Sequence, residues 1–141
     1  MKITIPMYEK GRSFIMAAGL VKAYEGEKFV YLHLLCQGFE NIGKAILLAH
    51  DYGKYGPQLC GHFGHHLDII LTEVNSILGI KLLSAGAEKE LLKLSEFYKN
   101  QQLRYGHKVD FQSFPNLKAD QLHHEIVEHL IVLNKKFNRI R

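Results

Sequence analysis

Residues 28–51 read KFVYLHLLCQGFENIGKAILLAHD, and this stretch decides the fold. Its apolar side chains recur at steps of three and four, at Leu32, Leu35, Phe39, Ile42 and Ile46. That spacing places all of them on one face of an α-helix. Because a helix rises about 1.5 Å per residue, the stretch predicts a helix roughly 36 Å long, which is long for a chain of 141 residues.

The same periodicity predicts four further helices. Their apolar positions are Phe14, Ala17, Ala18 and Val21; Leu67, Ile70, Val74 and Ile77; Leu91, Leu94 and Tyr98; and Leu122, Ile126, His129, Leu133 and Phe137. Ser13 and Asp120 are suited to cap the first and last of these helices. Glycines follow the others, at Gly53, Gly79 and Gly106. Because most connections are short, the predicted fold class is all-α, an up-and-down helical bundle of about five helices.

The composition is that of one globular domain, with 47% hydrophobic and 23% charged residues. We therefore expect a single helical domain over residues 1–141. Residues 1–10 are expected to form a mobile or docked arm, because residues 1–6 alternate apolar and polar side chains without a second strand to pair with. Since no apolar run approaches the roughly 20 residues of a membrane span, we expect a cytoplasmic protein away from membranes.

Glu40 and Lys44 lie four residues apart on the long helix, in the orientation that lets such a pair attract. The simplest interpretation is an ion pair that stabilises the helix. Gly38 and Gly43 favour a functional interpretation, because glycine costs about 1 kcal/mol inside a helix relative to alanine. Two glycines therefore suggest that another backbone or a ligand comes close.

The long helix also carries apolar side chains outside its main stripe, at Val30, Leu34, Leu47 and Leu48. Apolar surface in excess of one intramolecular contact usually marks an interface, so we expect a homodimer built on helix faces. The alternative is that other helices of the same chain surround this one completely.

Three short motifs occur in order along the predicted helices. They are Phe39-Glu40 followed by Lys44-Ala45; Tyr55-Gly56-Pro57 leading through Gly64-His65-His66-Leu67; and Tyr98 followed by Arg104-Tyr105. Together they resemble motifs of the HEPN family, the nucleotide-binding helical domains named for higher eukaryotes and prokaryotes. The resemblance spans residues 14–137. It implies a bundle that commonly dimerises and works on or beside nucleotides or RNA, in some members with a minimal nucleotidyltransferase.

Catalytic members of that family cleave RNA without metal, through an arginine, a polar residue and a histidine four to six residues beyond. In this chain Arg104 is followed by Tyr105, and His107 comes after only two intervening residues. This departure argues against ribonuclease activity. Lys44, Arg104, Tyr105 and His107 are then candidates for binding the phosphate and base of a nucleotide, since cations bind phosphate and an aromatic ring stacks on bases. The alternative is that residues 104–107 form an ordinary helix end, with Gly106 as its cap.

The chain has nine histidines, and three of them, His62, His65 and His66, crowd the start of the third predicted helix. If that turn is helical, His62 and His66 share a face, and such a pair can bind zinc. A full ligand set is not evident, so we expect neither metal nor cofactor. The two cysteines, Cys36 and Cys60, are expected to be buried thiols.

The sequence therefore predicts a non-catalytic, HEPN-like module that binds nucleotides or nucleic acid, as partner of a minimal nucleotidyltransferase in a toxin–antitoxin system. One alternative is a metal-independent ribonuclease that uses Arg104 and His107. Another is a His-rich metal-binding bundle. The formal net charge of +4 permits attraction to phosphate but does not decide between these functions.

Overall fold

The structure, a computed structural model, describes residues 5–101, 103 and 116–137, and every regular element in these residues is helical. The helices are α1 (Ile5–Ala23), α2 (Lys28–His50), α3 (Tyr52–Tyr55), α4 (Leu67–Leu78), α5 (Ala85–Tyr98) and α7 (Asp120–Phe137), with a 3₁₀ turn at Gly56–Gln58 and a π turn at Leu59–Phe63. The predicted all-α class is confirmed, and the arrangement is compatible with an up-and-down bundle. Within these ranges, no helix combines the length and apolar character needed to cross a bilayer.

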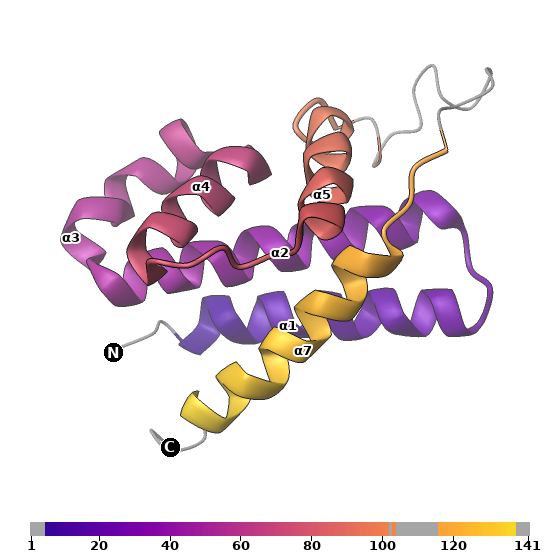
Figure 1. The fold of residues 1–141 in the computed structure, drawn as a ribbon, viewed down its shortest axis with the longest axis horizontal. Coiled ribbons are helices and arrows are strands. Elements are labelled where there is room, and N and C mark those ends of the chain that lie inside the picture. The colour runs from indigo at the N-terminus through magenta and orange to yellow at the C-terminus, as the bar shows by residue number, and fades with distance from the viewer. Residues whose placement is uncertain (1–4, 102, 104–115, 138–141) are drawn as a thin grey trace.

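The other helices pack around α2 (Figure 1). α1 runs antiparallel along one side of α2, α4 and α5 contact the opposite side, and α7 crosses the pair formed by α1 and α2. The apolar stripe predicted from the sequence is buried in this position. Two carboxylates set the ends of α2: Glu27 accepts a hydrogen bond from the Val30 N–H at 2.8 Å, and Asp51 accepts one from the Lys54 N–H at 3.0 Å and thereby starts α3.

α1 begins earlier than the sequence predicted. We expected an arm over residues 1–10 and a cap at Ser13, but the helix starts at Ile5 and Ser13 is an exposed residue in its interior. The buried positions keep helical spacing from the start, at Tyr8, Gly11, Ile15 and Ala18. Pro6 does not oppose this, because the first turn of a helix has no use for the missing N–H.

Glycines let α1 and α4 approach α2 closely. A methyl group built at Gly38 would lie 3.0 Å from the carbonyl oxygen of Gly11 in α1, and closer still to the side chain of Ile15. One built at Gly43 would overlap the side chain of Ile70 in α4. The expectation that these glycines mark a close approach is confirmed, and the approaching helices belong to the same chain.

Much of the additional apolar surface of α2 is also covered within the chain. Leu47 and Leu48 are buried and Leu34 is partly buried, whereas Val30 is 48% exposed. The alternative in which helices of one chain surround α2 accounts for most of this surface. The homodimer stays a prediction.

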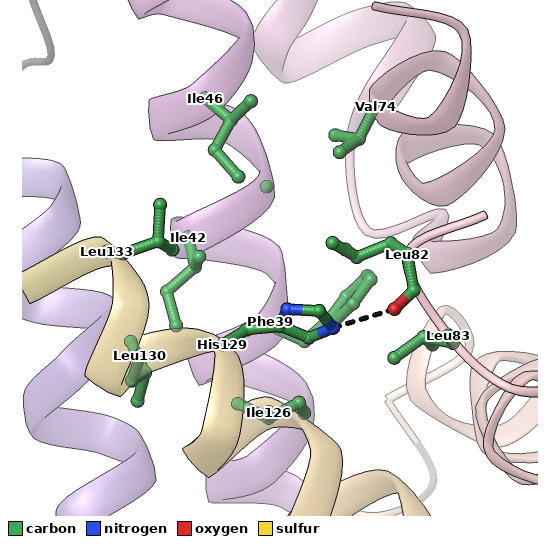
Figure 2. Close-up of a pocket in the computed structure, with 11 residues that line it drawn as sticks. Phe39, Ile42, Ile46, Val74, Leu82, Leu83, Ile126, His129, Leu130 and Leu133 are labelled. Carbon is green, nitrogen blue, oxygen red and sulfur yellow. Dashed lines mark hydrogen bonds between the residues drawn. The ribbon is translucent and has the colours of Figure 1, made fainter. Parts of the chain in front are cut away.

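A small apolar cavity of about 30 Å³ lies where α2, α7 and the segment joining α4 to α5 meet (Figure 2). Phe39, Ile126 and Leu83 are among its walls. Its one polar lining side chain, His129, turns toward Leu82 and places Nε2 2.7 Å from the Leu82 carbonyl oxygen. Because its walls are mostly buried apolar side chains and its one polar group is already hydrogen-bonded, this cavity is a feature of core packing.

Replacing Gly38 by alanine should lower the free energy of unfolding by about 1–3 kcal/mol, because the added methyl group would push α1 away from α2. The gain of about 1 kcal/mol in helix propensity is too small to offset this. Urea denaturation followed by circular dichroism measures the change. Gly19→Ala in α1 is the matched control, since a methyl group there would meet nothing nearer than the His123 ring at 4.0 Å. Stabilisation of both variants alike would contradict the close approach.

Candidate functional site

Two charged side chains are buried in the middle of α2. Glu40 and Lys44 are each 8% exposed, although Glu and Lys are almost never fully buried unless they are paired. Moving a charge out of water costs several kcal/mol, so each of these groups needs partners inside the protein.

Three donors converge on the Glu40 carboxylate. Lys44 Nζ lies 3.1 Å from Oε2, the Tyr98 hydroxyl lies 2.9 Å from Oε1, and Nδ1 of His65 lies 2.7 Å from the same Oε1. Tyr98 is the last residue of α5, and His65 lies two residues before α4. The carboxylate therefore ties three segments of the chain together. We call these four residues the Glu40 cluster.

The hydrogen bonds of the Glu40 cluster indicate which of its side-chain atoms carry a proton. An ionised carboxylate only accepts hydrogen bonds, so the geometry requires Nδ1 of His65 to carry the proton of this bond, and whenever the ring is neutral its Nε2 is an acceptor. Burial, together with the adjacent Glu40 carboxylate, raises the pKa of Tyr98, whose hydroxyl therefore keeps its proton. Burial also raises the pKa of the Cys36 thiol, which excludes it as a nucleophile near neutral pH.

The His65 side chain is 54% exposed and stands at the edge of a shallow pocket of about 50 Å³. The lining residues, His33, Gln37, His65, Tyr98 and Gln101, come from α2, α5 and the segments next to α4 and α5. Tyr98 is buried among these lining residues, and the His65 ring packs edge-on against its ring at 5.7 Å between centroids. None of these residues is Lys, Arg, Asp or Glu, so this polar pocket suits an uncharged group that forms hydrogen bonds.

Lys44 was predicted to bind phosphate, but the structure points its ammonium group at Glu40 instead. The Lys44 side chain is 10% exposed, and a phosphate would have to displace the carboxylate from it. The assignment of Lys44 as a phosphate contact stays a prediction. The other predicted contacts, Arg104, Tyr105 and His107, lie outside the described residues.

The three clustered histidines are separated by the backbone. His62 lies in the π turn at Leu59–Phe63, with its ring 4.8 Å from that of Phe63, and His66 precedes α4. Gly64 stands between them with φ of 44°, a conformation that favours glycine. His62 and His66 were expected to share a face only if this turn is helical, and that condition is not met, because the backbone leaves helical geometry at Gly64. In residues 5–101, 103 and 116–137, no three His, Cys, Asp or Glu side chains are grouped so that they could hold a metal ion.

The two cysteines differ in exposure. Cys36 is fully buried in α2 as predicted, whereas Cys60 is exposed in the π turn, so the prediction of a buried thiol is wrong there. The expectation rested on the general tendency of free cysteines to be buried, and it fails at Cys60 because this residue lies in a turn rather than on the apolar face of a helix.

The sequence indicated Glu40 and Lys44 as a pair but not their connection to His65 and Tyr98. These residues lie 25 and 58 positions from Glu40 along the chain, and helical spacing carries no information over such separations. The only available signal was that each belongs to one of the three motifs that resemble the HEPN family.

No family model, no curated protein and no solved structure matches this chain. The HEPN resemblance therefore continues to rest on its three motifs alone.

Removing the negative charge with Glu40→Gln should destabilise the fold by about 3–5 kcal/mol, because Lys44 would be left as an unpaired buried cation. Adding Lys44→Met should recover most of that loss, and urea denaturation of the single and double variants measures both effects. Glu96→Gln is the control: its exposed ion pair with Lys99 resembles the Glu40–Lys44 pair in chemistry and should contribute less than about 1 kcal/mol. Additive losses in the double variant would show that the two buried charges do not depend on each other.

Proposed function

We propose that this chain is a non-catalytic, HEPN-like module that binds nucleotides or RNA, with the polar pocket as its contact for a nucleobase. The observation that carries the proposal is that His65 stands at the pocket edge with its Nδ1 hydrogen-bonded to buried Glu40. The Glu40 cluster thereby holds the ring in one tautomer, so that Nε2 is available as a hydrogen-bond acceptor.

The chemistry of the pocket supports a nucleobase as the bound group. Gln37 and Gln101 each carry an amide that both donates and accepts, and the His65 ring adds an acceptor. Base edges present the same mixture of donors and acceptors without charge. At about 50 Å³ the pocket admits the edge of a base rather than a whole nucleotide, as expected for a base turned out of a single strand.

The described residues of this lining carry no Lys, Arg, Asp or Glu, which supports binding over catalysis. Phosphoryl transfer needs cations where negative charge develops, and Lys44, the cation of the Glu40 cluster, is paired with Glu40. The Cys36 thiol, near the pocket, keeps its proton because burial raises its pKa. Dimerisation and a minimal nucleotidyltransferase partner belong to the same proposal and rest on the family resemblance.

One observation favours a second candidate, an acid–base enzyme. A histidine that donates from Nδ1 to a buried carboxylate is the arrangement that orients a general base. In that case His65, rather than the previously suggested pair Arg104 and His107, would accept a proton from the RNA 2′-hydroxyl.

Fluorescence anisotropy with a labelled single-stranded oligoribonucleotide tests the binding proposal. The wild-type chain should bind, and Gln37→Ala and His65→Gln should each weaken binding by about three- to tenfold, the value of one lost hydrogen bond. His62→Gln, which alters an exposed histidine outside the pocket, is the matched control and should bind like the wild type. Binding that is unaffected by both pocket variants would contradict the proposal.

Incubating the same RNA with the chain, with and without a chelator, separates the alternatives. The proposal predicts intact RNA in both samples. Cleavage lost in His65→Gln would establish the acid–base enzyme, and cleavage lost in His107→Ala would establish the Arg104 and His107 ribonuclease. Cleavage lost only with the chelator would establish a metal enzyme.

A further inference from the structure

A second hollow, with a volume of about 390 Å³, lies between the turn that joins α1 to α2 and the segment that leads into α7. Its size falls in the usual range for small-molecule sites. Buried apolar side chains form its base, at Tyr31, Leu32 and Leu117. Three lysines line it, at Lys22, Lys28 and Lys118. We call it the lysine groove.

The lysine groove carries a net positive charge. Among the lining residues that the structure describes, three lysines stand against one carboxylate, Asp120, which leaves a net charge of +2. Lys28 Nζ donates a long hydrogen bond, 3.3 Å, to the side-chain oxygen of Asn116, which is a neutral group. A concave surface with apolar walls concentrates such a field and attracts anions into it.

Asp120 shows where an anionic oxygen sits in the groove. One of its carboxylate oxygens lies 2.8 Å from Lys22 Nζ, and this ammonium group holds the pKa of Asp120 below its usual value. The Asp120 side chain is 76% exposed, so the ion pair is weak and can open at little cost. An incoming anion with more charge than one carboxylate can therefore take its place on Lys22.

The lysines, rather than the start of α7, supply the attraction. The N–H of Leu122, in the first turn of α7, already donates to Glu90 at 2.8 Å. Tyr31 is likewise occupied, because its hydroxyl is bonded to Nδ1 of His123 at 2.8 Å. The pKa of the partly buried His123 is lowered by desolvation and by Lys22, so this ring stays neutral near pH 7 and adds no further positive charge beside the groove.

We propose that the lysine groove binds a small ligand with two or more phosphate groups, such as a diphosphate. The positive charge of the described lining is opposite in sign to that of such a group, and the lysines on opposite walls allow it to be held from both sides. The groove shares no lining residue with the polar pocket, so this inference does not depend on the proposed function.

Isothermal titration calorimetry with inorganic pyrophosphate, at low salt and pH 7.5 or so, tests the proposal on the full chain. The double variant Lys28→Gln, Lys118→Gln should bind at least roughly tenfold more weakly, since each charged hydrogen bond is worth about that factor. Lys89→Gln, Lys93→Gln on α5 is the matched control, because it removes the same charge from exposed positions outside the groove and should leave the affinity within about twofold.

The variant Asp120→Asn should raise the affinity for pyrophosphate instead of lowering it. A gain of affinity cannot be caused by misfolding. The substitution removes the carboxylate that competes for Lys22, so pyrophosphate should bind at least about threefold more tightly. Repeating the titrations with a nucleoside diphosphate shows whether a nucleoside adds affinity to the same phosphate contacts. Absence of binding by both probes, equal weakening in the two lysine double variants, or weaker binding by Asp120→Asn would each overturn the proposal.

Discussion

The rest of the structure depends on one constraint: the carboxylate of Glu40, buried in the middle of α2, must be matched by donors from the protein. Lys44 supplies a charge from the same helix, and His65 and Tyr98 supply hydrogen bonds from segments far along the chain. An unmatched charge at this depth would cost several kcal/mol, so the positions of α4 and α5 relative to α2 are coupled to it. The polar pocket exists because this requirement brings His65 and Tyr98 together.

The apolar packing of α2 leaves one side of this helix for the Glu40 cluster. Gly38 allows α1 to lie against α2, Gly43 allows α4 to do so, and α7 covers the apolar stripe around Phe39. With those faces filled by apolar contacts, Glu40 meets the end of α5 and the segment before α4, and Lys44 pairs with Glu40. The two candidate binding places follow from this division, because the polar pocket opens beside the Glu40 cluster and the lysine groove opens at the junction of α1, α2 and α7.

Patterns within short stretches of the sequence predicted the features that depend on neighbouring residues of one helix. The bounds of α2 agree with the prediction to within one residue, because its stripe is unbroken, and the pairing of Glu40 with Lys44 follows from spacing within one helix. The sequence does not reveal the start of α1, because residues 1–6 alternate apolar and polar side chains and the helical spacing of buried positions begins only with Tyr8 and Gly11. The path around Gly64 was missed because a π turn followed by a positive φ has no apolar period. Contacts of Glu40 with His65 and Tyr98, and the gathering of Lys22, Lys28 and Lys118, join distant segments and cannot be predicted from helical spacing.

The central claim is that buried Glu40 holds His65 in one tautomer, and nitrogen-15 NMR of the imidazole rings tests it most directly. Spectra are best recorded near pH 8.5, about two units above the ordinary histidine pKa, with His65 assigned by its loss in His65→Gln. We predict a protonated Nδ1 and an unprotonated Nε2 for His65. A protonated Nε2, or averaged shifts for both nitrogens as in a solvated ring, would contradict the account.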